Sequence, residues 1–385
     1  MHRTNIIFFI LVLALLVSSC VKPFNPKIKT ADANKYVVSG QLTNVDGSQT
    51  VNVSRTSSIN DPKFLPVKGC DVRILDKNKN SFAMTDIGKG EYSTWIDPKF
   101  LVPGASFMVK VITPDGDTLV SDFDKMAKAP KVDSVYYIRK DIEGKIPGQL
   151  TKGIQFFLNF KGNDSDSRFY RWNIYETWEY HAEYPLEWYY DGTVHHVYPP
   201  DYSRKVCWRT LKIPKIFTLS TNNLMKNNYN KFPLQFVDNQ TSRLAYGYSM
   251  LVEQFALSEA AYNYWDQLRI NSSQAGGLYE KQPLAIKGNI RDLSHPDKEV
   301  LGFFSVASVT DKRIFVSNVP NLPLQFYTYC NSHSLRMGLK EISPSDYPAY
   351  LMGNHKTYFA VQLDGECVNC LLLGGTNIKP NFWPK

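Results

Sequence analysis

The feature that most constrains the fold is a series of short alternating segments, each closed by a turn, between residues 36 and 122. Apolar residues recur there at every second position, which is the period of a strand. Tight-turn residues such as Asp46-Gly47 and Pro114-Asp115-Gly116 separate the segments. Seven short strands in this space predict an immunoglobulin-like β-sandwich at residues 35–126. The expected strands are Tyr36–Leu42, Gln49–Arg55, Gly69–Asp76, Ser81–Asp86, Glu91–Trp95, Ser106–Thr113 and Thr118–Asp122.

A second β-rich region is expected at residues 131–385, after a joint near Ala127-Lys128-Ala129-Pro130. In one segment, apolar residues from Ile154 to Phe160 alternate with more polar ones, and residues 170–175 alternate in the same way. Further expected strands are Val206–Leu211, Leu284–Arg291, Val300–Thr310 and Tyr358–Leu363. The predicted fold class is therefore mainly β, with a sandwich followed by a larger β-rich domain.

One segment of this second region has helical rather than strand period. Apolar residues from Leu257 to Leu268, including Tyr264 and Trp265, recur at spacings of three and one. Ser258 is placed to cap the start of the helix, and Gly276-Gly277 follows its end. We therefore expect at least one α-helix packed on the sheet, with Trp265 in the core.

The N-terminus predicts export. Twelve uninterrupted apolar residues run from Ile6 to Val17, after a basic head at His2-Arg3. As a helix they would span only about 18 Å of a hydrocarbon layer about 30 Å thick. The segment is therefore too short for a stable membrane span, and residues 1–19 are expected to be a secretory signal peptide.

The end of the signal segment, Val17-Ser18-Ser19-Cys20, resembles the bacterial lipobox. That resemblance implies cleavage before Cys20, acylation of its thiol and amino group, and a lipidated linker at residues 20–34. Two or more acyl chains anchor a protein stably, so membrane lipid is an expected partner. The alternative is an ordinary signal peptide with an accidental final cysteine.

Length and charge set broad limits on the mature chain. Removing 19 of 385 residues leaves 366, which favours two domains over one core. The formal charge of +8 falls to +7 without Arg3, and no basic block occurs. Nucleic acid is therefore not an expected partner, whereas anionic lipid headgroups are compatible with the excess.

Five cysteines remain beside Cys20. Cys70 shares a strand face with Val72 and Ile74, so we expect it to be a core thiol. Four others form an even set in an oxidising compartment, and we expect two disulfides of unknown pairing among Cys207, Cys330, Cys367 and Cys370. A four-cysteine zinc site and a CxxC redox pair at 367–370 are the alternatives.

Aromatic and acidic residues gather at 169–196, and this segment is the candidate ligand-binding site. Its rings and carboxylates suit sugar binding, because ring faces stack on sugars and carboxylates accept hydroxyl hydrogen bonds. The candidate residues are Trp178, Trp188, Tyr189, Tyr190, Glu176 and Glu179. The alternative is packing: alternation places Tyr170, Trp172, Trp178 and Tyr180 on one side. Residues 188–190 are expected in a loop after Pro185.

Catalytic signatures are largely missing from the sequence. The segment Gly247-Tyr248-Ser249-Met250-Leu251 begins like a nucleophile elbow but lacks its closing glycine. No P-loop and no HExxH motif occur. We therefore predict no catalytic residue, no cofactor and no metal.

Two resemblances cover most of the chain. Residues 65–72, with Thr85-Asp86 and Gly90-Glu91-Tyr92, resemble the carboxypeptidase-regulatory-like sandwich, which implies a spacer or interaction module without protease chemistry. Together with the lipobox and the aromatic C-terminal part, the ending resembles an uncharacterised family of Bacteroidota outer-membrane lipoproteins. That ending comprises Cys367-Val368-Asn369-Cys370, Gly374-Gly375-Thr376-Asn377 and Lys379-Pro380-Asn381-Phe382-Trp383.

The family resemblance implies an accessory role beside a TonB-dependent outer-membrane receptor. The leading expectation is a non-catalytic outer-membrane lipoprotein that binds such a transporter and a ligand, with its membrane face undecided. A glycoside hydrolase or glycan-binding module using residues 169–196 is the alternative, and a hydrolase would need two carboxylates about 5 to 9.5 Å apart. A structural or assembly factor without ligand is a third class.

Overall fold

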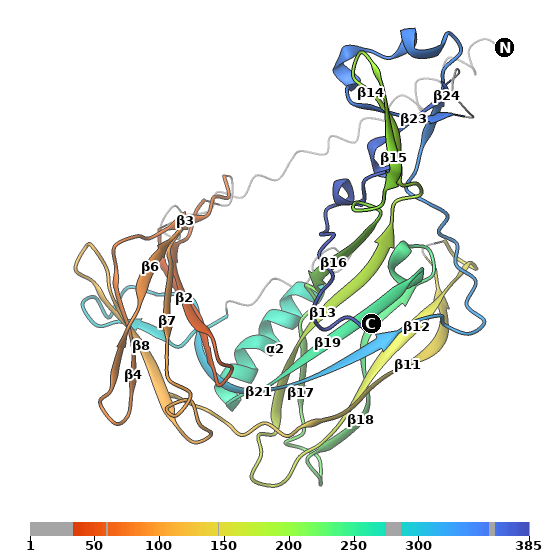
Figure 1. Cartoon of the computed structure of the whole chain (residues 1–385). Helices are drawn as coiled ribbons and strands as arrows, with labels where there is room; N and C mark the ends of the chain where they lie inside the picture. The colour runs from red at the N-terminus through yellow and green to blue at the C-terminus, as the bar shows by residue number, and fades with distance from the viewer. Residues whose placement is uncertain (1–33, 59–60, 145, 275–285, 354–358, 385) are drawn as a thin grey trace, which may run out of the picture.

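The computed structural model describes residues 34–58, 61–144, 146–274, 286–353 and 359–384, and they form two lobes with a small sheet that projects from the larger one (Figure 1). The chain is mainly β with several sheets and one described α-helix, as the sequence predicts. Cys20 and the signal segment lie outside the described residues. In the part of the chain that is described, no helix is both long and apolar enough to cross a membrane.

The N-terminal lobe is a β-sandwich whose strands match the seven expected segments closely. The segment Ser81–Asp86 divides into two strands, because its first half pairs with β4 in one sheet and its second half with β7 in the other. Cys70 is buried and free in the core between the sheets, as predicted. The strands are β1 (Tyr36–Thr43), β2 (Ser48–Arg55), β3 (Leu65–Pro66), β4 (Asp71–Asp76), β5 (Ser81–Ala83), β6 (Thr85–Gly88), β7 (Glu91–Trp95), β8 (Ser106–Ile112), β9 (Thr118–Ser121) and β10 (Asp124–Lys125).

The C-terminal lobe packs a three-stranded sheet against a larger one. The smaller sheet joins β11 (Val132–Glu143), β12 (Leu150–Lys161) and β18 (Asn228–Asp238). Inward residues of β12, from Ile154 to Phe160, are fully buried, so the predicted alternation is confirmed. The facing strands are β13 (Phe169–His181), β16 (Val206–Lys212), β17 (Phe217–Ser220), β19 (Gly247–Ala256) and β21 (Phe304–Val316).

The strand β21 joins the lobes into one continuous sheet. Its first residues, from Phe304 to Ala307, pair in parallel with β1. The following residues, from Ser308 to Val316, pair antiparallel with β19. The resulting order is β16-β13-β19-β21-β1-β2-β7-β6, which runs from one lobe to the other.

The N-terminal lobe also takes in a segment that the sequence analysis grouped with the C-terminal region. The strand β20 (Ile290–Asp292) pairs with β9, and Val300 and Phe304 belong to the sandwich core. Gly302 lies where this segment meets β1, and a Cβ atom there would lie 2.0 Å from the Val38 carbonyl oxygen. Such a close approach requires glycine.

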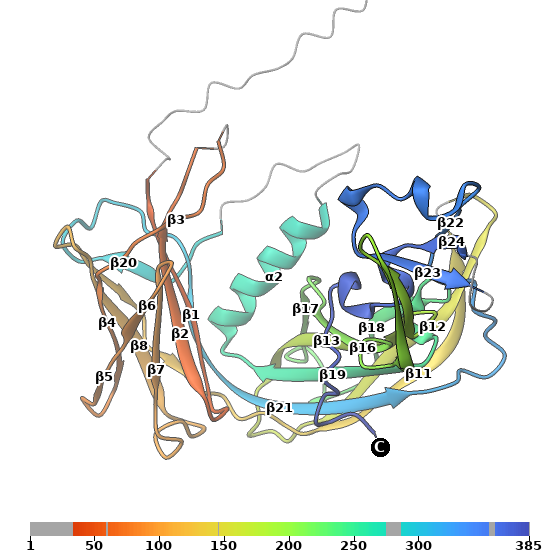
Figure 2. The same cartoon turned by 45° about the horizontal axis from the view of Figure 1, so that its top comes forward.

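The single described α-helix, α2 (Glu259–Gln274), lies between the strands of the two lobes (Figure 2). Ser258 caps it, since its Oγ accepts a hydrogen bond from the Ala261 amide at 3.2 Å. Its apolar side packs on Phe255 and Phe303 of the shared sheet region. Short 3₁₀ helices complete the fold: η2 (Ser242–Leu244), η3 (Gly338–Glu341), η4 (Pro344–Asp346), η5 (Gly365–Cys367) and η6 (Cys370–Leu373).

The projecting sheet combines one segment expected to be a loop with one expected strand, since Tyr358–Leu363 matches β24 over its described residues. Residues 188–190 lie in a strand and not in the loop predicted after Pro185, because they pair with β15 and β23. Pairing partners distant in sequence thus override the local turn signal. The strands are β14 (Leu186–Tyr190), β15 (Val194–Asp201), β22 (Ser332–Ser334), β23 (Ala349–Gly353) and β24 (Phe359–Leu363).

Candidate functional site

The predicted aromatic segment begins on β13, and most of its rings there face the core. Tyr170, Trp172, Trp178 and Tyr180 are all buried within the C-terminal core cluster. They follow the even-numbered face of the strand, as the packing alternative predicts. These rings therefore pack in the protein interior and are not available to bind a ligand at the surface.

The two candidate glutamates of β13 have different surroundings. The buried Glu176 carboxylate is 3.3 Å from Nη1 of Arg243 and accepts a hydrogen bond from the Tyr248 hydroxyl at 3.2 Å. Glu179 accepts a hydrogen bond from Nε1 of Trp383 at 3.2 Å and lies 2.7 Å from His181. Glu179 lines a cavity of about 330 Å³ with Trp383, whereas Glu176 does not. The structure thus does not gather both carboxylates around this cavity.

The remaining candidates, Trp188, Tyr189 and Tyr190, belong to the projecting sheet. Trp188 stacks on His196 with ring centroids 3.8 Å apart, and Tyr189 stacks on His195 at 4.5 Å. Trp188 and Tyr190 also pack against the small core of that sheet. Their rings are therefore partly covered by neighbours in the same sheet.

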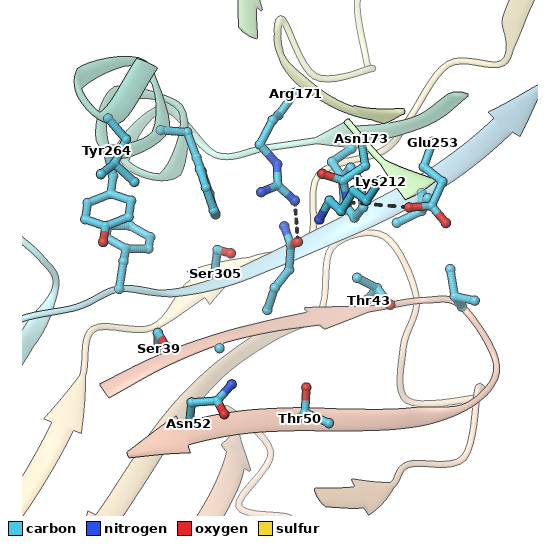
Figure 3. Close-up of a pocket in the computed structure, with 18 of the residues that line it drawn as sticks. Ser39, Thr43, Thr50, Asn52, Arg171, Asn173, Lys212, Glu253, Tyr264 and Ser305 are labelled. Carbon is cyan, nitrogen blue, oxygen red and sulfur yellow. Dashed lines mark hydrogen bonds between the residues drawn. The ribbon is translucent and has the colours of Figure 1, made fainter. Parts of the chain in front are cut away.

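The opposite, odd-numbered face of β13 lines a cleft that the sequence analysis did not predict. Arg171 and Asn173 point into a cavity of about 500 Å³ between the lobes (Figure 3). Tyr175 lines the same cavity. β1 and β2 line it from the N-terminal lobe, and α2 contributes Tyr264, Trp265 and Leu268. Other lining residues are Ser39, Gln41, Thr43, Thr50, Asn52, Lys212, Glu253, Phe255 and Ser305. The cleft therefore lies on one face of the sheet that both lobes share.

Arg171 is the central cation of this cleft, and its side chain is held from both lobes. Its Nη2 donates to Oε1 of Gln41 at 2.6 Å. Its guanidinium carbon lies 4.0 Å from the ring centre of Trp265 and 4.6 Å from that of Phe255. Burial lowers the pKa of Arg171 to about 10, so the group remains charged at neutral pH.

Three polar atoms of the cleft are buried and have no hydrogen-bond partner among the residues that the structure describes. They are Nε of Arg171, Nε2 of Gln41 and Nε1 of Trp265, and all three are donors. Buried donors are normally paired, so three orphans in one cleft indicate a missing acceptor.

Three further ionisable groups, Lys212, Tyr175 and Glu253, flank Arg171. Burial lowers the pKa of Lys212, and the neighbouring Arg171 charge lowers it further, while Glu253 acts in the opposite direction. Burial also raises the pKa of Tyr175, with Glu253 adding to the effect. Glu253 itself accepts a hydrogen bond from Nδ2 of Asn173 at 3.5 Å. The cleft thus combines two cations with one carboxylate.

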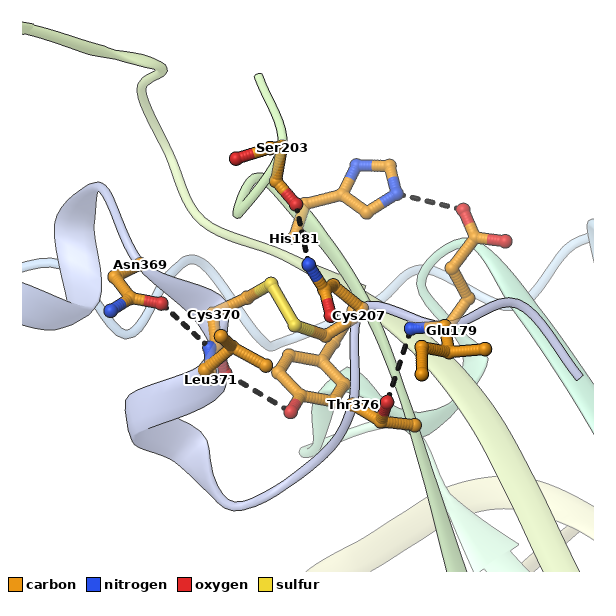
Figure 4. The surroundings of a disulfide bond; sticks show 11 residues. Glu179, His181, Ser203, Cys207, Asn369, Cys370, Leu371 and Thr376 are labelled. Atoms are coloured by element: carbon orange, nitrogen blue, oxygen red, sulfur yellow. Dashed lines mark hydrogen bonds and ion pairs between the residues drawn. A yellow bond between two sulfur atoms is a disulfide. The ribbon is translucent and has the colours of Figure 1, made fainter. Parts of the chain in front are cut away.

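Both predicted disulfides are present. Cys207 on β16 is bonded to Cys370, and Cys330 to Cys367. The two cysteines of the CxxC motif therefore have different partners, so they form neither a redox pair nor, with the other two, a zinc site. Figure 4 shows the disulfide between Cys207 and Cys370. Beside it, the Tyr180 hydroxyl donates to the Cys370 carbonyl at 3.1 Å. The C-terminal tail is thereby attached to β16.

One further group could hold a metal ion by geometry. Ligand atoms of Asp117, Asp292 and His295 all lie within 4.8 Å of one another in the described chain. However, Nδ1 of His295 lies 2.9 Å from Asp117, and Asp292 accepts hydrogen bonds from the amides of Ser294 and His295. These groups partner one another, so the arrangement is explained without an ion.

Fold and cleft together define a two-lobed, mainly β protein with two disulfides and a polar, ligand-sized cavity between the lobes. The chain belongs to the family described as "Domain of unknown function (DUF4249)", whose model matches residues 21–313. This agrees with the resemblance of the sequence to an uncharacterised family. No curated protein matches the chain.

Two solved structures show weak likenesses to this chain. Trypsin-activated alpha-2-macroglobulin from Escherichia coli is 10% identical over 62% of this chain and 15% of its own, with a TM-score of 0.20. A DUF4785 family protein from Legionella pneumophila is 10% identical over 56% of this chain and 51% of its own, with a TM-score of 0.16. This chain spans less than two thirds of either protein, and neither likeness supports an argument about function.

Proposed function

We propose that the protein is a non-catalytic, lipid-anchored binding protein of the outer membrane that works beside a TonB-dependent transporter. The lipobox ending at Cys20 and the resemblance to Bacteroidota lipoproteins support the location. The cavity between the lobes supports the binding role, because it is preformed and has the size of typical small-molecule sites.

The composition of the cleft is the observation that carries this proposal. Among the described residues that line it, Glu253 is the only carboxylate, and no histidine or cysteine is present. General acid–base catalysis most often uses such groups, frequently as a pair, and the other ionisable groups of the lining are Arg171, Lys212 and the tyrosines Tyr175 and Tyr264. The cleft instead presents a buried cation, unpaired donors and hydroxyl or amide side chains, which suit recognition more than turnover.

Anchoring is tested by replacing the acylated cysteine. The Cys20→Ala variant should not incorporate radiolabelled palmitate and should leave the membrane fraction. Cys70→Ala is the matched control, since Cys70 is a buried free thiol of the sandwich. Palmitate labelling of the Cys20→Ala variant at the parent level would refute the anchor.

The transporter partnership is tested by native co-purification. Affinity-tagged full-length protein, extracted from its own outer membrane in mild detergent, should recover a β-barrel receptor in stoichiometric amount. Recovery of the protein alone, at the same yield and with the anchor intact, would contradict the partnership without affecting the binding role of the cleft.

Glycan binding on the projecting sheet is a second candidate. It is favoured by Tyr198, which is 83% exposed beside the Trp188–His196 stack. Tyr198→Ala should weaken retention on immobilised envelope polysaccharide if that surface stacks on sugars. For the hydrolase alternative, Glu179→Gln, at the candidate carboxylate that lines a cavity, should abolish any reducing-sugar release, and unchanged release would exclude Glu179 as a catalytic acid.

A further inference from the structure

We propose that the cleft between the lobes binds a small organic carboxylate, with Arg171 as the group that receives the carboxylate. This inference rests on the proposed binding function and specifies its ligand class. Four observations carry it: an unbalanced buried charge, orphaned donors, a fixed guanidinium and the net charge of the lining.

The first observation is that Arg171 has no counterion in contact with it, although the Glu253 charge acts on it at longer range. Only 5% of the Arg171 surface is exposed, and no carboxylate oxygen of the described chain lies within 4.0 Å of a guanidinium nitrogen. Among the described residues, the neutral Gln41 amide oxygen is its only hydrogen-bond acceptor. By contrast, Arg243 contacts the carboxylates of Glu176 and Asp238. A buried cation is costly unless it is paired, so an anionic ligand bound beside Arg171 would stabilise it.

The second observation is the set of unpaired donors, and the third is the fixed position of the guanidinium. Ring contacts from Trp265 and Phe255 hold the guanidinium, whose hydrogen-bond donors lie along its edge. On that edge Nε is unpaired, and Nε2 of Gln41 and Nε1 of Trp265 are two further buried donors without acceptors. A carboxylate matches a fixed guanidinium edge because it can accept two parallel hydrogen bonds.

The fourth observation selects a monoanion. Arg171 and Lys212 supply two positive charges to the lining and Glu253 supplies one negative charge, which leaves one cation in excess. A carboxylate neutralises this excess, whereas a phosphate dianion would overcompensate it. Hydroxyl and amide groups of Ser39, Thr50 and Asn52 line the N-terminal side and suit neutral polar parts of the ligand.

The test is titration calorimetry of the full lipoprotein in detergent micelles, so that it does not depend on anchoring or on a transporter. Benzoate and N-acetyl-trialanine are the carboxylate probes, and they distinguish a small aromatic acid from a peptide C-terminus. Their amides, benzamide and N-acetyl-trialanine amide, keep the shape but lack the charge. Phenyl phosphate tests the alternative anion.

At least one carboxylate probe should bind saturably below about 10 mM, and its amide should bind at least about 10-fold more weakly. Arg171→Gln should weaken carboxylate binding about 10- to 100-fold, while Arg171→Lys should give an intermediate loss. Arg313→Gln is the matched control, because Arg313 is on β21 and stacks on Phe382 outside the cleft. It should bind like the parent.

Three results would overturn the proposal: no saturable binding of either carboxylate, equal affinity for acid and amide, or parental affinity in Arg171→Gln. If phenyl phosphate binds more tightly than either carboxylate and Arg171→Gln weakens that binding, the ligand is a phosphate ester and the carboxylate proposal is wrong. If Arg171→Gln fails to fold by circular dichroism, Lys212→Gln is used instead, and a carboxylate affinity unchanged by Lys212→Gln would equally contradict the charge argument. None of these outcomes tests the membrane anchor or the transporter partnership, which are tested by separate experiments.

Discussion

Arg171 on β13 donates a hydrogen bond to Gln41 on β1 at 2.6 Å, although 130 residues separate them in sequence. The two strands belong to different lobes, and β19 and β21 lie between them in the shared sheet. The bond therefore spans the cleft from one lobe to the other. The geometry of the cleft consequently depends on how β21 holds the two lobes together.

The same substitution at the buried Arg171 and at the half-buried Arg243 should have different effects on stability. Arg171→Met should leave the free energy of unfolding within about 1 kcal/mol of the parent or raise it, because an unpaired buried charge is removed. Arg243→Met should lower it by about 3 kcal/mol, since Glu176 would be left without its cation. Urea denaturation measures both values. A loss above about 2 kcal/mol in Arg171→Met would show that Arg171 is chiefly a structural group.

The junction glycine at the start of β21 gives a second prediction. Gly302 has a φ of +100° and no room for a Cβ atom beside Val38, so Gly302→Ala should cost at least about 3 kcal/mol. Gly116 has a similar φ of +91° but nothing within 4 Å, so Gly116→Ala should cost only about 1 kcal/mol. Thermal unfolding compares them. Equal losses would mean that backbone strain alone decides both.

The parts of the fold that depend on local pattern could be predicted from the sequence. Strands such as Glu91–Trp95 follow from alternation and flanking turns, and the helix start follows from the cap at Ser258. The shared sheet could not be predicted, because the parallel pairing of Gly40 with Phe304 joins segments 264 residues apart. Nothing in either segment specifies its distant partner.

The cleft was missed for a related reason. Alternation correctly grouped the rings of β13 on one face, and it equally placed Arg171, Asn173 and Tyr175 on the other. The local signal that could have indicated the cleft was Arg171, an arginine between the core residues Tyr170 and Trp172. Whether that face met solvent, another lobe or a cavity depended on β1, β2 and α2, whose positions come from tertiary packing.

The two disulfides should open in a fixed order under mild reductant. Both sulfur-bearing residues of Cys207–Cys370 are fully buried, whereas Cys330 is partly exposed. Thiolate attack requires access, so Cys330 and Cys367 should be alkylated first. Peptide mapping after timed reduction and iodoacetamide measures the order. First labelling at Cys207 or Cys370 would mean that the C-terminal tail detaches more readily than its burial indicates.

Stability should depend on pH through Asp124 of β10. Burial raises the pKa of this carboxyl, whose Oδ2 accepts the Val306 amide at 2.7 Å at the start of β21. A raised folded-state pKa means that the unfolded chain ionises first, so ionisation favours unfolding as pH rises from the unfolded value through the folded one.

Asp124→Asn should therefore be more stable than the parent at pH 7, because the asparagine oxygen still accepts the Val306 hydrogen bond without a buried charge. The difference should shrink as the pH falls from 7 toward the unfolded Asp value of about 3.9, because protonation of the folded parent carboxyl removes the buried charge. Urea denaturation at several pH values measures this, with Asp141→Asn on the exposed end of β11 as the control for charge removal. A variant less stable than the parent at pH 7 would show that the charged hydrogen bond to β21 outweighs the desolvation of Asp124.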